Sequence, residues 1–486
     1  MRTHIIQGGY RHPAEVEGAQ LTWRNAPQHS SETRRLRPLL IAEAANPHWT
    51  SVPLVGWNLS RAIAARTDAL VATQLRNREA FLQAGLVEGR DFLAIDNEKT
   101  AGAFHRIGER LRGGENRGWT AVTALASFAY YSFEQELLRV LGSRLADGEF
   151  DLVHRITPLT PTSQSLIARR LAPMGIPFVL GPLNGGTPWP ASFDDVRRKE
   201  RDWLTPIREL YRLMPAYRAT RSKAAAIIVG SSAAFEQIPK QWQSKVTLMP
   251  ENGIDPQRFP FKRRVMQAGP LRVAFIGRLV PYKGADVLLE AVAMCADRLL
   301  IEVVIIGDGP EREALEIMVA ARDLSHCVRF EGWVEQEELA SRLADCHVLA
   351  LPSVREFGGG VVLEAMALGL VPVVADHGGP PELIDEGCGI AVAFDDRESL
   401  VKGFAVALRT LSDRPELIEP MSAEAGAKVR REHAWDVKAD KILAIYHSLL
   451  HAKQPAATCI NPLPQDERNR RTDYQLLNEL DNIISK

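Results

Sequence analysis

The feature of this sequence that most constrains its fold is the alternation of short apolar runs with longer amphipathic stretches. Runs typical of β-strands lie at 37–44, 68–73, 151–156, 177–181, 225–230 and 246–250, and again at 271–277, 301–307, 328–332, 347–353 and 371–376. Stretches with helical periodicity lie between them, among them Asn58–Ala65, Ala285–Cys295 and Glu311–Arg322. Strands that alternate with helices in this way predict parallel, doubly wound α/β sheets.

The 486 residues are enough for two or three domains. The segment 250–270 holds four prolines and two glycines among polar residues and marks a linker. We therefore divide the chain into a polar N-terminal extension (1–37), a first α/β domain (38–250), a linker (251–270), a second α/β domain (271–435), a helix (436–451) and a polar tail (452–486). Two such domains face a cleft, and ligands of these folds bind at the carboxyl ends of the strands.

Composition excludes several classes of protein. The hydrophobic fraction of 45% and charged fraction of 24% are those of a globular chain, not a disordered or collagen-like one. The five cysteines form no C-x-x-C pair, which argues against zinc and disulfides and favours a cytoplasmic protein. No apolar run is long enough to span a bilayer. The charge is uneven, about +9 for residues 1–250 and about −10 for residues 251–486, so the basic half is a candidate for an acidic ligand or membrane surface.

The richest motif is LPSVREFGGGVVLEAMALG, which begins at Leu351. A strand leads into a loop with Glu356, then glycines, then a helix that carries Glu364 near its start. Glycines allow close approach of the backbone to a ligand, and a helix N-terminus suits phosphate. The two carboxylates can then face a sugar and a ribose with a diphosphate between them, whereas glycines alone are equally consistent with a structural turn.

Two further motifs follow strands of the second domain. In GRLVPYKG, Arg278 and Lys283 come directly after a strand, where they can bind a diphosphate or remain solvated loop charges. In FEGWV, Trp333 can stack on a nucleobase or fill a hydrophobic gap.

Together these motifs, with VIIGDGPERE and NGIDPQRF, resemble the retaining GT-B glycosyltransferases of family 4, the glycosyl transferases group 1 type. The resemblance covers about residues 220–450. It implies two Rossmann-like domains facing a cleft and a C-terminal helix that crosses back to the first domain. The residues it assigns to catalysis are Arg278, Lys283 and Glu356. Those it assigns to donor binding are Gly277, Trp333, Val334, Phe357, Gly358, Gly359 and Glu364.

The first half matches the family less closely. The segment 46–57 resembles an N-terminal loop in which some family members carry Gly-Ser-Glu, but this chain has Thr50-Ser51-Val52 there, so the carboxylate is missing. Residues that follow strands and can face an acceptor are Asn184, Gly185, Gly186 and His154. A histidine in the place of His154 is more often packed in the core than functional.

The expected function is transfer of a sugar from a nucleotide-diphosphate sugar to a sugar, glycan or lipid-linked acceptor with retention of configuration, in polysaccharide or glycolipid assembly. The sequence predicts no cofactor, no metal and no nucleic-acid partner. The alternatives are a non-catalytic nucleotide-sugar-binding protein and a related GT-B nucleotide-sugar epimerase. An oxidoreductase is disfavoured because IGDGPERE has only part of the G-x-G-x-x-G pattern.

The segment 197–223 combines nine basic and three acidic residues with apolar residues at helical spacing. A basic amphipathic helix of this kind can lie on an anionic membrane. It predicts peripheral contact with the inner face of the cytoplasmic membrane, and the alternative is a helix packed on the first domain.

Overall fold

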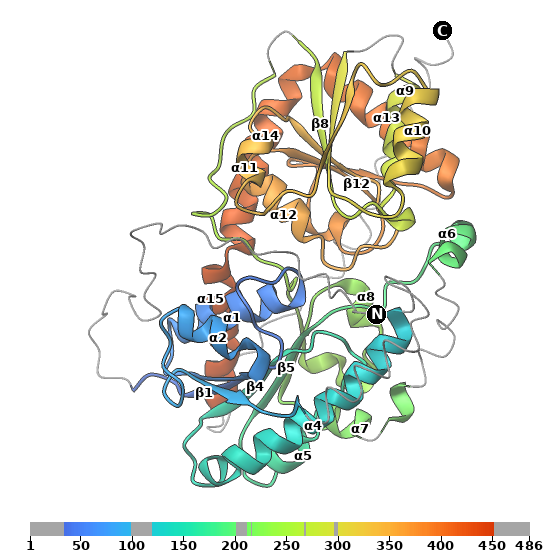
Figure 1. Ribbon diagram of the computed structural model, residues 1–486. Helices are drawn as coiled ribbons and strands as arrows, with labels where there is room; N and C mark the ends of the chain where they lie inside the picture. Colours follow the sequence, from blue (N-terminus) through green and yellow to red (C-terminus); the bar gives the residue numbers. More distant parts are fainter. Residues whose placement is uncertain are drawn as a thin grey trace, which may run out of the picture.

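The computed structural model describes residues 34–98, 119–200, 211–214, 216–266, 269–295 and 300–451. They form two α/β domains, each built on one parallel sheet (Figure 1). The first sheet has the order β3-β2-β1-β4-β5-β6-β7, and the second has the order β10-β9-β8-β11-β12-β13. The predicted doubly wound α/β architecture is therefore confirmed.

The strands are short and almost entirely apolar, because helices cover both faces of a parallel sheet. The strands of the first sheet are β1 (Pro38–Ala42), β2 (Leu70–Gln74), β3 (Phe92–Ile95), β4 (Leu152–Thr157), β5 (Phe178–Leu183), β6 (Ala226–Val229) and β7 (Val246–Leu248). Those of the second are β8 (Leu271–Ile276), β9 (Ile301–Ile306), β10 (Val328–Gly332), β11 (Val348–Leu351), β12 (Val371–Ala375) and β13 (Ile390–Val392). Every residue of β1, β5 and β12 is buried.

Two helical layers sandwich the first sheet. One core beneath it joins β1, β4 and β6 to α1 (Val52–Ala64), α2 (Arg78–Gln83) and α15 (Trp435–His451). The other joins the opposite face to α4 (Trp119–Ala146), α5 (Ile167–Leu171) and α8 (Ser232–Glu236). The helix α7 (Tyr217–Lys223) packs beside α5.

The second sheet is covered in the same manner. On one face lie α9 (Ala285–Ala293), α10 (Arg312–Ala321) and α13 (Arg397–Asp413). On the other lie α11 (Leu339–Arg342), α12 (Gly360–Ala367) and α14 (Ile418–Lys428). The helix α6 (Asp194–Lys199) comes from the first half of the chain but lies beside this second domain (Figure 1).

Apart from the excursion of the chain to α6, the chain passes between the domains at two neighbouring places. The amide of Ile254 donates to the carbonyl of His433 at 2.9 Å, and the amide of Trp435 donates to the carbonyl of Ile254 at 3.1 Å. From there α15 returns to pack on α1 in the first domain. Part of the predicted linker is structured, since Ile254 and Phe259 are buried in the core of the second domain.

The segment 197–223 differs from the predicted single amphipathic helix. Helix α6 ends at Lys199, and α7 begins at Tyr217 after Ala216, which has a left-handed backbone with φ of 69°. Arg221 is buried rather than facing a membrane, and its neighbour Tyr217 is buried too. The apolar positions between 201 and 210 lie outside the described residues.

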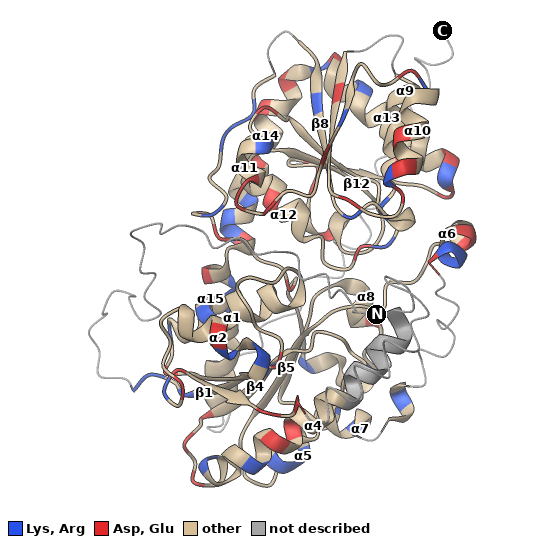
Figure 2. Ribbon diagram, in the orientation of Figure 1, with Lys and Arg blue, Asp and Glu red and all other residues tan. Residues whose placement is uncertain are grey.

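Charge is mixed over the molecule. Lys and Arg are interspersed with Asp and Glu in both domains, so the uneven charge of the two halves does not gather into one basic face in this view (Figure 2). Among the helices that the structure describes, none combines the length and the hydropathy needed to cross a membrane.

Candidate active site

The carboxyl ends of the two sheets meet at the interface between the domains. All strands within a sheet run parallel, so the loops after them share one edge. Both carboxylate oxygens of Glu382 in the second domain lie 3.0 Å from the amide nitrogen of Ser232, at the start of α8 in the first. His377 Nε2, after β12, lies 2.9 Å from the carbonyl oxygen of Pro188, after β5. Residues from either edge can therefore act on one bound molecule.

Lys283 and Glu356 form a shielded ion pair on the second domain's edge. Lys283 ends the short helix η5 (Pro281–Lys283), and Glu356 follows β11. The Tyr282 carbonyl accepts hydrogen bonds from the amide of Val354 at 3.0 Å and from Ser353 Oγ at 3.1 Å, which ties the two loops together. Burial acts to lower the pKa of Lys283, but the attraction of Glu356 outweighs it and raises that pKa. The ammonium group is therefore held charged in a site largely screened from water.

Arg278 has the opposite surroundings. It follows Gly277 at the end of β8, is exposed, and makes no ion pair with any residue in the described part of the chain. A Cβ at Gly277 would lie 3.9 Å from Cδ of Lys283, so the lysine side chain runs directly beside this turn. The structure thus brings the two predicted cations to the same strand end.

The glycine loop leads into α12. Gly359, with φ of 57°, immediately precedes the first helical residue and adopts the left-handed conformation that glycine accepts without strain. The amides of Phe357, Gly358 and Gly359 lie in the loop before this helix, whose positive dipole end favours an anion or an electronegative ligand. A Cβ at Gly358 would come within 1.8 Å of Glu251 Oε1, so only glycine fits this approach.

Glu364 lies in the second turn of α12, where Gln336 Nε2 donates to its Oε1. Burial raises the pKa of Glu364 to about 7, an effect that the Gln336 hydrogen bond and the charge of Arg258 only partly oppose. Gln336 belongs to the turn that follows β10, so its hydrogen bond places this turn beside Glu364.

The same turn holds Trp333 and Val334. Trp333 is 63% exposed, and its indole nitrogen donates to Glu335 Oε1 at 3.2 Å. It is therefore not a buried hydrophobic plug, whereas Val334 packs partly against the core. An exposed indole near the buried carboxyl of Glu364 is an arrangement that suits a base beside a ribose.

The predicted acceptor-side residues differ in how far their polar groups are available to a ligand. Asn184 is buried, and its side chain is bound within the protein: Nδ2 donates to Glu251 Oε1 at 2.6 Å, and Oδ1 accepts from Ser231 Oγ at 3.0 Å. Gly185 and Gly186 have φ of 122° and 87° and form the turn after β5. Gln237 Nε2 donates to the Gly185 carbonyl at 3.2 Å. This turn lies at the interface edge, but Asn184 has its polar atoms engaged in holding it there.

The assignment of His154 to the acceptor side needs correction. Its side chain has 0% exposure, Nδ1 lies 2.5 Å from Tyr446 Oη, and Nε2 lies 2.6 Å from the Gly181 carbonyl. Burial lowers the pKa of His154 to about 4, so the ring is neutral. Because Nε2 must donate to the carbonyl, Nδ1 accepts from Tyr446. The residue fastens α15 to the first sheet and has no surface to offer an acceptor.

Sequence reasoning missed Glu251 and Lys438 at the interface. Glu251 follows β7, is buried, and has an Oε2 with no hydrogen-bond partner in the described structure. Burial raises its pKa. Burial also lowers the pKa of Lys438 to about 7, and its Nζ donates to the Pro250 carbonyl at 2.5 Å. The position of Glu251 directly after a strand was the available signal.

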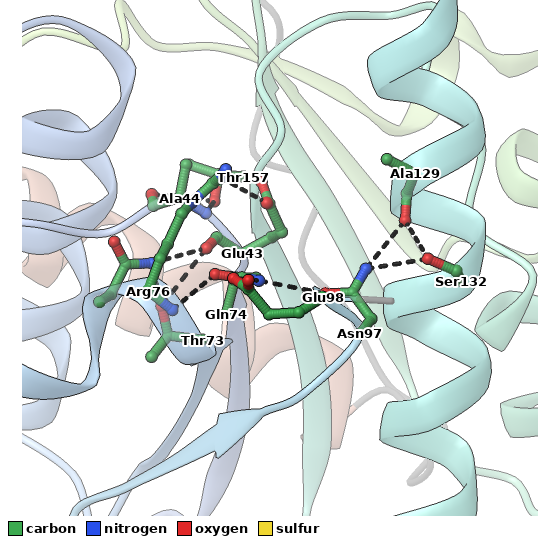
Figure 3. Close-up of polar contacts among 11 residues, drawn as sticks. Glu43, Ala44, Thr73, Gln74, Arg76, Asn97, Glu98, Ala129, Ser132 and Thr157 are labelled. Carbon is green, nitrogen blue, oxygen red and sulfur yellow. Dashed lines mark hydrogen bonds and ion pairs between the residues drawn. The ribbon is translucent and has the colours of Figure 1, made fainter. Parts of the chain in front are cut away.

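A second group that sequence reasoning missed lies at the carboxyl ends of β1, β2 and β3 (Figure 3). Gln74 Nε2 donates to Asn97 Oδ1 at 3.3 Å and to Glu98 Oε1 at 3.1 Å. Arg76 pairs with Glu43 at 2.6 Å, and burial raises the pKa of Glu43 despite that charge. We call Glu43, Gln74, Asn97 and Glu98 the first-domain polar cluster. Amide and carboxyl groups in this setting can bind the hydroxyls of a polyol.

Comparison with known proteins places these features in context. The family described as "Glycosyl transferases group 1" matches residues 258–421. The chain is 31% identical over 211 residues to the amylovoran biosynthesis glycosyltransferase AmsK of Erwinia amylovora, a match that covers 40% of this chain and 51% of that protein. It is 30% identical over 331 residues to a D-inositol 3-phosphate glycosyltransferase of Streptomyces griseus, covering 62% and 68% of the two chains. The chain thus spans about half the length of the first relative and two thirds of the second.

Solved structures agree in fold. The Anabaena protein HepE, crystallised with UDP, superposes with a TM-score of 0.56 at 16% identity, over 85% of this chain and 99% of that one. Sucrose-phosphate synthase from Thermosynechococcus elongatus superposes with a TM-score of 0.56 at 17% identity, over 86% and 100%. At such identities the likeness shows the GT-B fold and carries no statement about substrates.

Proposed function

Because this chain belongs to the glycosyl transferases group 1 family, we propose that it transfers a sugar from a nucleotide-diphosphate sugar to an acceptor hydroxyl with retention of configuration. The observation that carries the proposal is the assembly of Arg278, the Lys283–Glu356 pair and the glycine loop before α12 on one sheet edge. A basic pair beside a helix N-terminus is suited to a diphosphate whose negative charge grows as the glycosidic bond breaks.

We assign residues to the diphosphate, the sugar, the ribose and the base of the nucleotide-sugar donor. Arg278 and Lys283 neutralise the departing diphosphate, and the amides of Phe357, Gly358 and Gly359 with Glu356 hold the transferred sugar. Glu364 binds the ribose, while Trp333 and Val334 hold the base beside Gly277. Support comes from the exposure of Trp333 and from its place on the same turn as Gln336, which contacts Glu364.

The chemistry needs no protein nucleophile in this proposal. Retaining hydrolases place two carboxylates ~5 Å apart across the sugar, whereas Glu356 here is paired with Lys283. We infer that the departing phosphate oxygen takes the proton of the acceptor hydroxyl as the new bond forms on the same face. Proton and leaving group then balance without a metal or cofactor.

For the acceptor we propose a sugar, glycan or lipid-linked sugar in polysaccharide or glycolipid assembly, used at the inner face of the cytoplasmic membrane. The first-domain polar cluster supports a polyhydroxylated acceptor, and the turn at Asn184, Gly185 and Gly186 lies on the same edge. Names of relatives point the same way, with amylovoran biosynthesis for one and a phosphatidylinositol monomannoside mannosyltransferase for another.

The experiment incubates the purified chain with UDP-, GDP-, ADP- and dTDP-sugars and follows nucleotide release with and without a panel of glycan and lipid-linked acceptors. Transfer with retained anomeric configuration, seen by NMR of the product, is expected. Tight nucleotide binding with no turnover would instead indicate a sugar-nucleotide sensor. Conversion of the donor sugar without an acceptor would indicate an epimerase.

A further inference from the structure

A segment of the first half of the chain packs as part of the second domain. We call Thr187–Lys199 the arm. Phe193 and Val196 are buried in the core that contains α9 and α13. Ser192 Oγ donates to the Asp395 carbonyl at 2.5 Å, and the Phe193 ring meets the Phe394 ring edge-on at 5.6 Å. In Figure 1 the arm's helix α6 accordingly stands apart from the other helices of the first domain.

The arm lies against both loops that carry the Lys283–Glu356 pair. Helix α6 contacts η5, which ends in Lys283. Trp189 lies under the guanidinium of Arg355, whose central carbon is 4.6 Å from the indole centroid. The same guanidinium lies 5.7 Å from the ring of Phe357. Arg355 and Phe357 flank Glu356 in sequence, so the arm contacts the residue before Glu356, and that residue in turn lies against the ring of the residue after it.

The arm is also anchored in the first domain. It begins directly after Gly185 and Gly186, where a Cβ at Gly186 would meet Gln237 Nε2 at 2.0 Å. Only two residues, Thr187 and Pro188, lie between Trp189 and Gly186 at the carboxyl edge of the first sheet. A single short segment therefore links the acceptor-side edge to the loop of Glu356.

We propose that Trp189 is a positioning residue for the donor loop, which acts on Glu356 through Arg355. This inference rests on the proposed function. A guanidinium over an indole is a favourable cation–π contact, and it limits the orientations open to the backbone beside Glu356. Such a constraint matters for rate because small displacements of a catalytic group lower turnover steeply. The arm thereby adds a first-half residue to the donor part of the site, whose other proposed residues belong to the second domain.

The test is a double-mutant cycle with Trp189→Ala, Arg355→Ala and the combined variant, measured as kcat and donor KM. Trp189→Ala is expected to lower kcat by about tenfold or more, with a smaller change in KM. Trp189→Phe should restore most of kcat, because a ring remains for Arg355 to stack on. The combined variant should be no slower than the slower single variant, since the two residues act as one unit.

The matched control is Trp242→Ala, which removes a half-buried tryptophan that packs on the core of the first domain away from the donor loops. Its kcat should equal that of the wild type below its unfolding temperature. Additive effects of Trp189→Ala and Arg355→Ala, or full kcat in Trp189→Ala, would overturn the inference.

Hydrogen exchange of residues 353–360 supplies a readout that does not depend on transfer. These amides should exchange faster in Trp189→Ala than in the wild type or in Trp242→Ala. A wild type that transfers no sugar from any donor overturns the proposed function, while the exchange of 353–360 still decides whether Trp189 holds the loop. Unchanged exchange would contradict the inference by itself.

Discussion

Lys283 and Arg278 carry the same charge in opposite surroundings, and their roles in stability differ accordingly. Lys283 is largely buried with Glu356, whereas Arg278 is exposed and lacks an ion pair within the described structure. Removing one partner of a shielded pair leaves the other charge buried and unpaired, which destabilises the folded state. An exposed cation contributes little to folding stability. Variants at the two positions therefore separate catalysis from folding.

We expect Arg278→Ala to lower kcat by about 10²-fold, the usual loss when one group that stabilises developing charge is removed. Its melting temperature should stay within about 1 °C of the wild type. Lys283→Ala should lose turnover to a similar extent and also melt earlier, because Glu356 is left unpaired. Steady-state kinetics and thermal unfolding measure both, and full turnover in both variants would rule out the diphosphate role.

Glu364 makes stability depend on pH. Burial raises its pKa to about 7 in the folded chain, above the ordinary value of about 4.3 for an unfolded glutamate. The folded state therefore holds a proton that the unfolded state releases. The contribution of this group is fully present below pH ~4.3 and is lost as pH rises through 7, by at most ~4 kcal/mol.

In Glu364→Gln the free energy of unfolding should accordingly fall less steeply as the pH rises. Urea unfolding at pH 5 and pH 8 should show a smaller difference for the variant than for the wild type. The same variant should bind the nucleotide more weakly, because the amide replaces an acceptor with a donor at the ribose. Identical pH dependence in the two proteins would show that this carboxyl is not protonated by burial.

At the scale of elements, most of the short apolar runs correctly predicted strands. The runs at 37–44 and 271–277 contain β1 and β8, whose buried residues come from both faces of a parallel sheet. The short strands β3 and β13 were not predicted. Both are edge strands of their sheets. An edge strand pairs with one neighbour only and can be short, so its apolar pattern is too short to recognise in the sequence. The helix α1 starts at Val52, six residues before its predicted start, with Pro53 in its first turn.

The C-terminal helix α15 is fastened to the first sheet by Tyr446. Tyr446→Phe leaves Nδ1 of His154 buried without a donor, which should lower the free energy of unfolding by about 1–3 kcal/mol. Turnover at 25 °C should be unchanged, because neither residue contacts the donor loops. Urea unfolding measures this loss of stability, and Ser448→Ala on the exposed side of α15 is the control. Equal stability of the Phe variant and the wild type would contradict this account of the helix.

At the scale of the whole molecule, the sequence predicted which loops meet but not how their side chains pair. Arg278, Lys283, Glu356 and Glu364 each follow or lie near a strand end, and parallel strands bring such ends to one edge. The pairing of Lys283 with Glu356 depends on residues 73 positions apart, which periodicity cannot relate. Glu251 escaped prediction because its burial is created by contact between the domains.

Transfer should not require a divalent cation. In the proposed mechanism Arg278 and Lys283 already supply positive charge for the diphosphate. We expect the rate to be the same with EDTA as without it. A rate that falls to background in EDTA and returns with Mg²⁺ or Mn²⁺ would contradict the proposed mechanism.

The routes by which the chain connects the domains restrict how they can move. The passages at Ile254 and at His433–Trp435 are hydrogen-bonded to each other and so act as one attachment. The arm beyond Gly186 provides a second attachment, because Phe193 and Ser192 hold it on the second domain. Two fixed points define a line, so the easiest motion is a rotation about that line. Sliding one sheet across the other would break one attachment, so we expect any relative motion of the domains to keep the donor and acceptor edges in register.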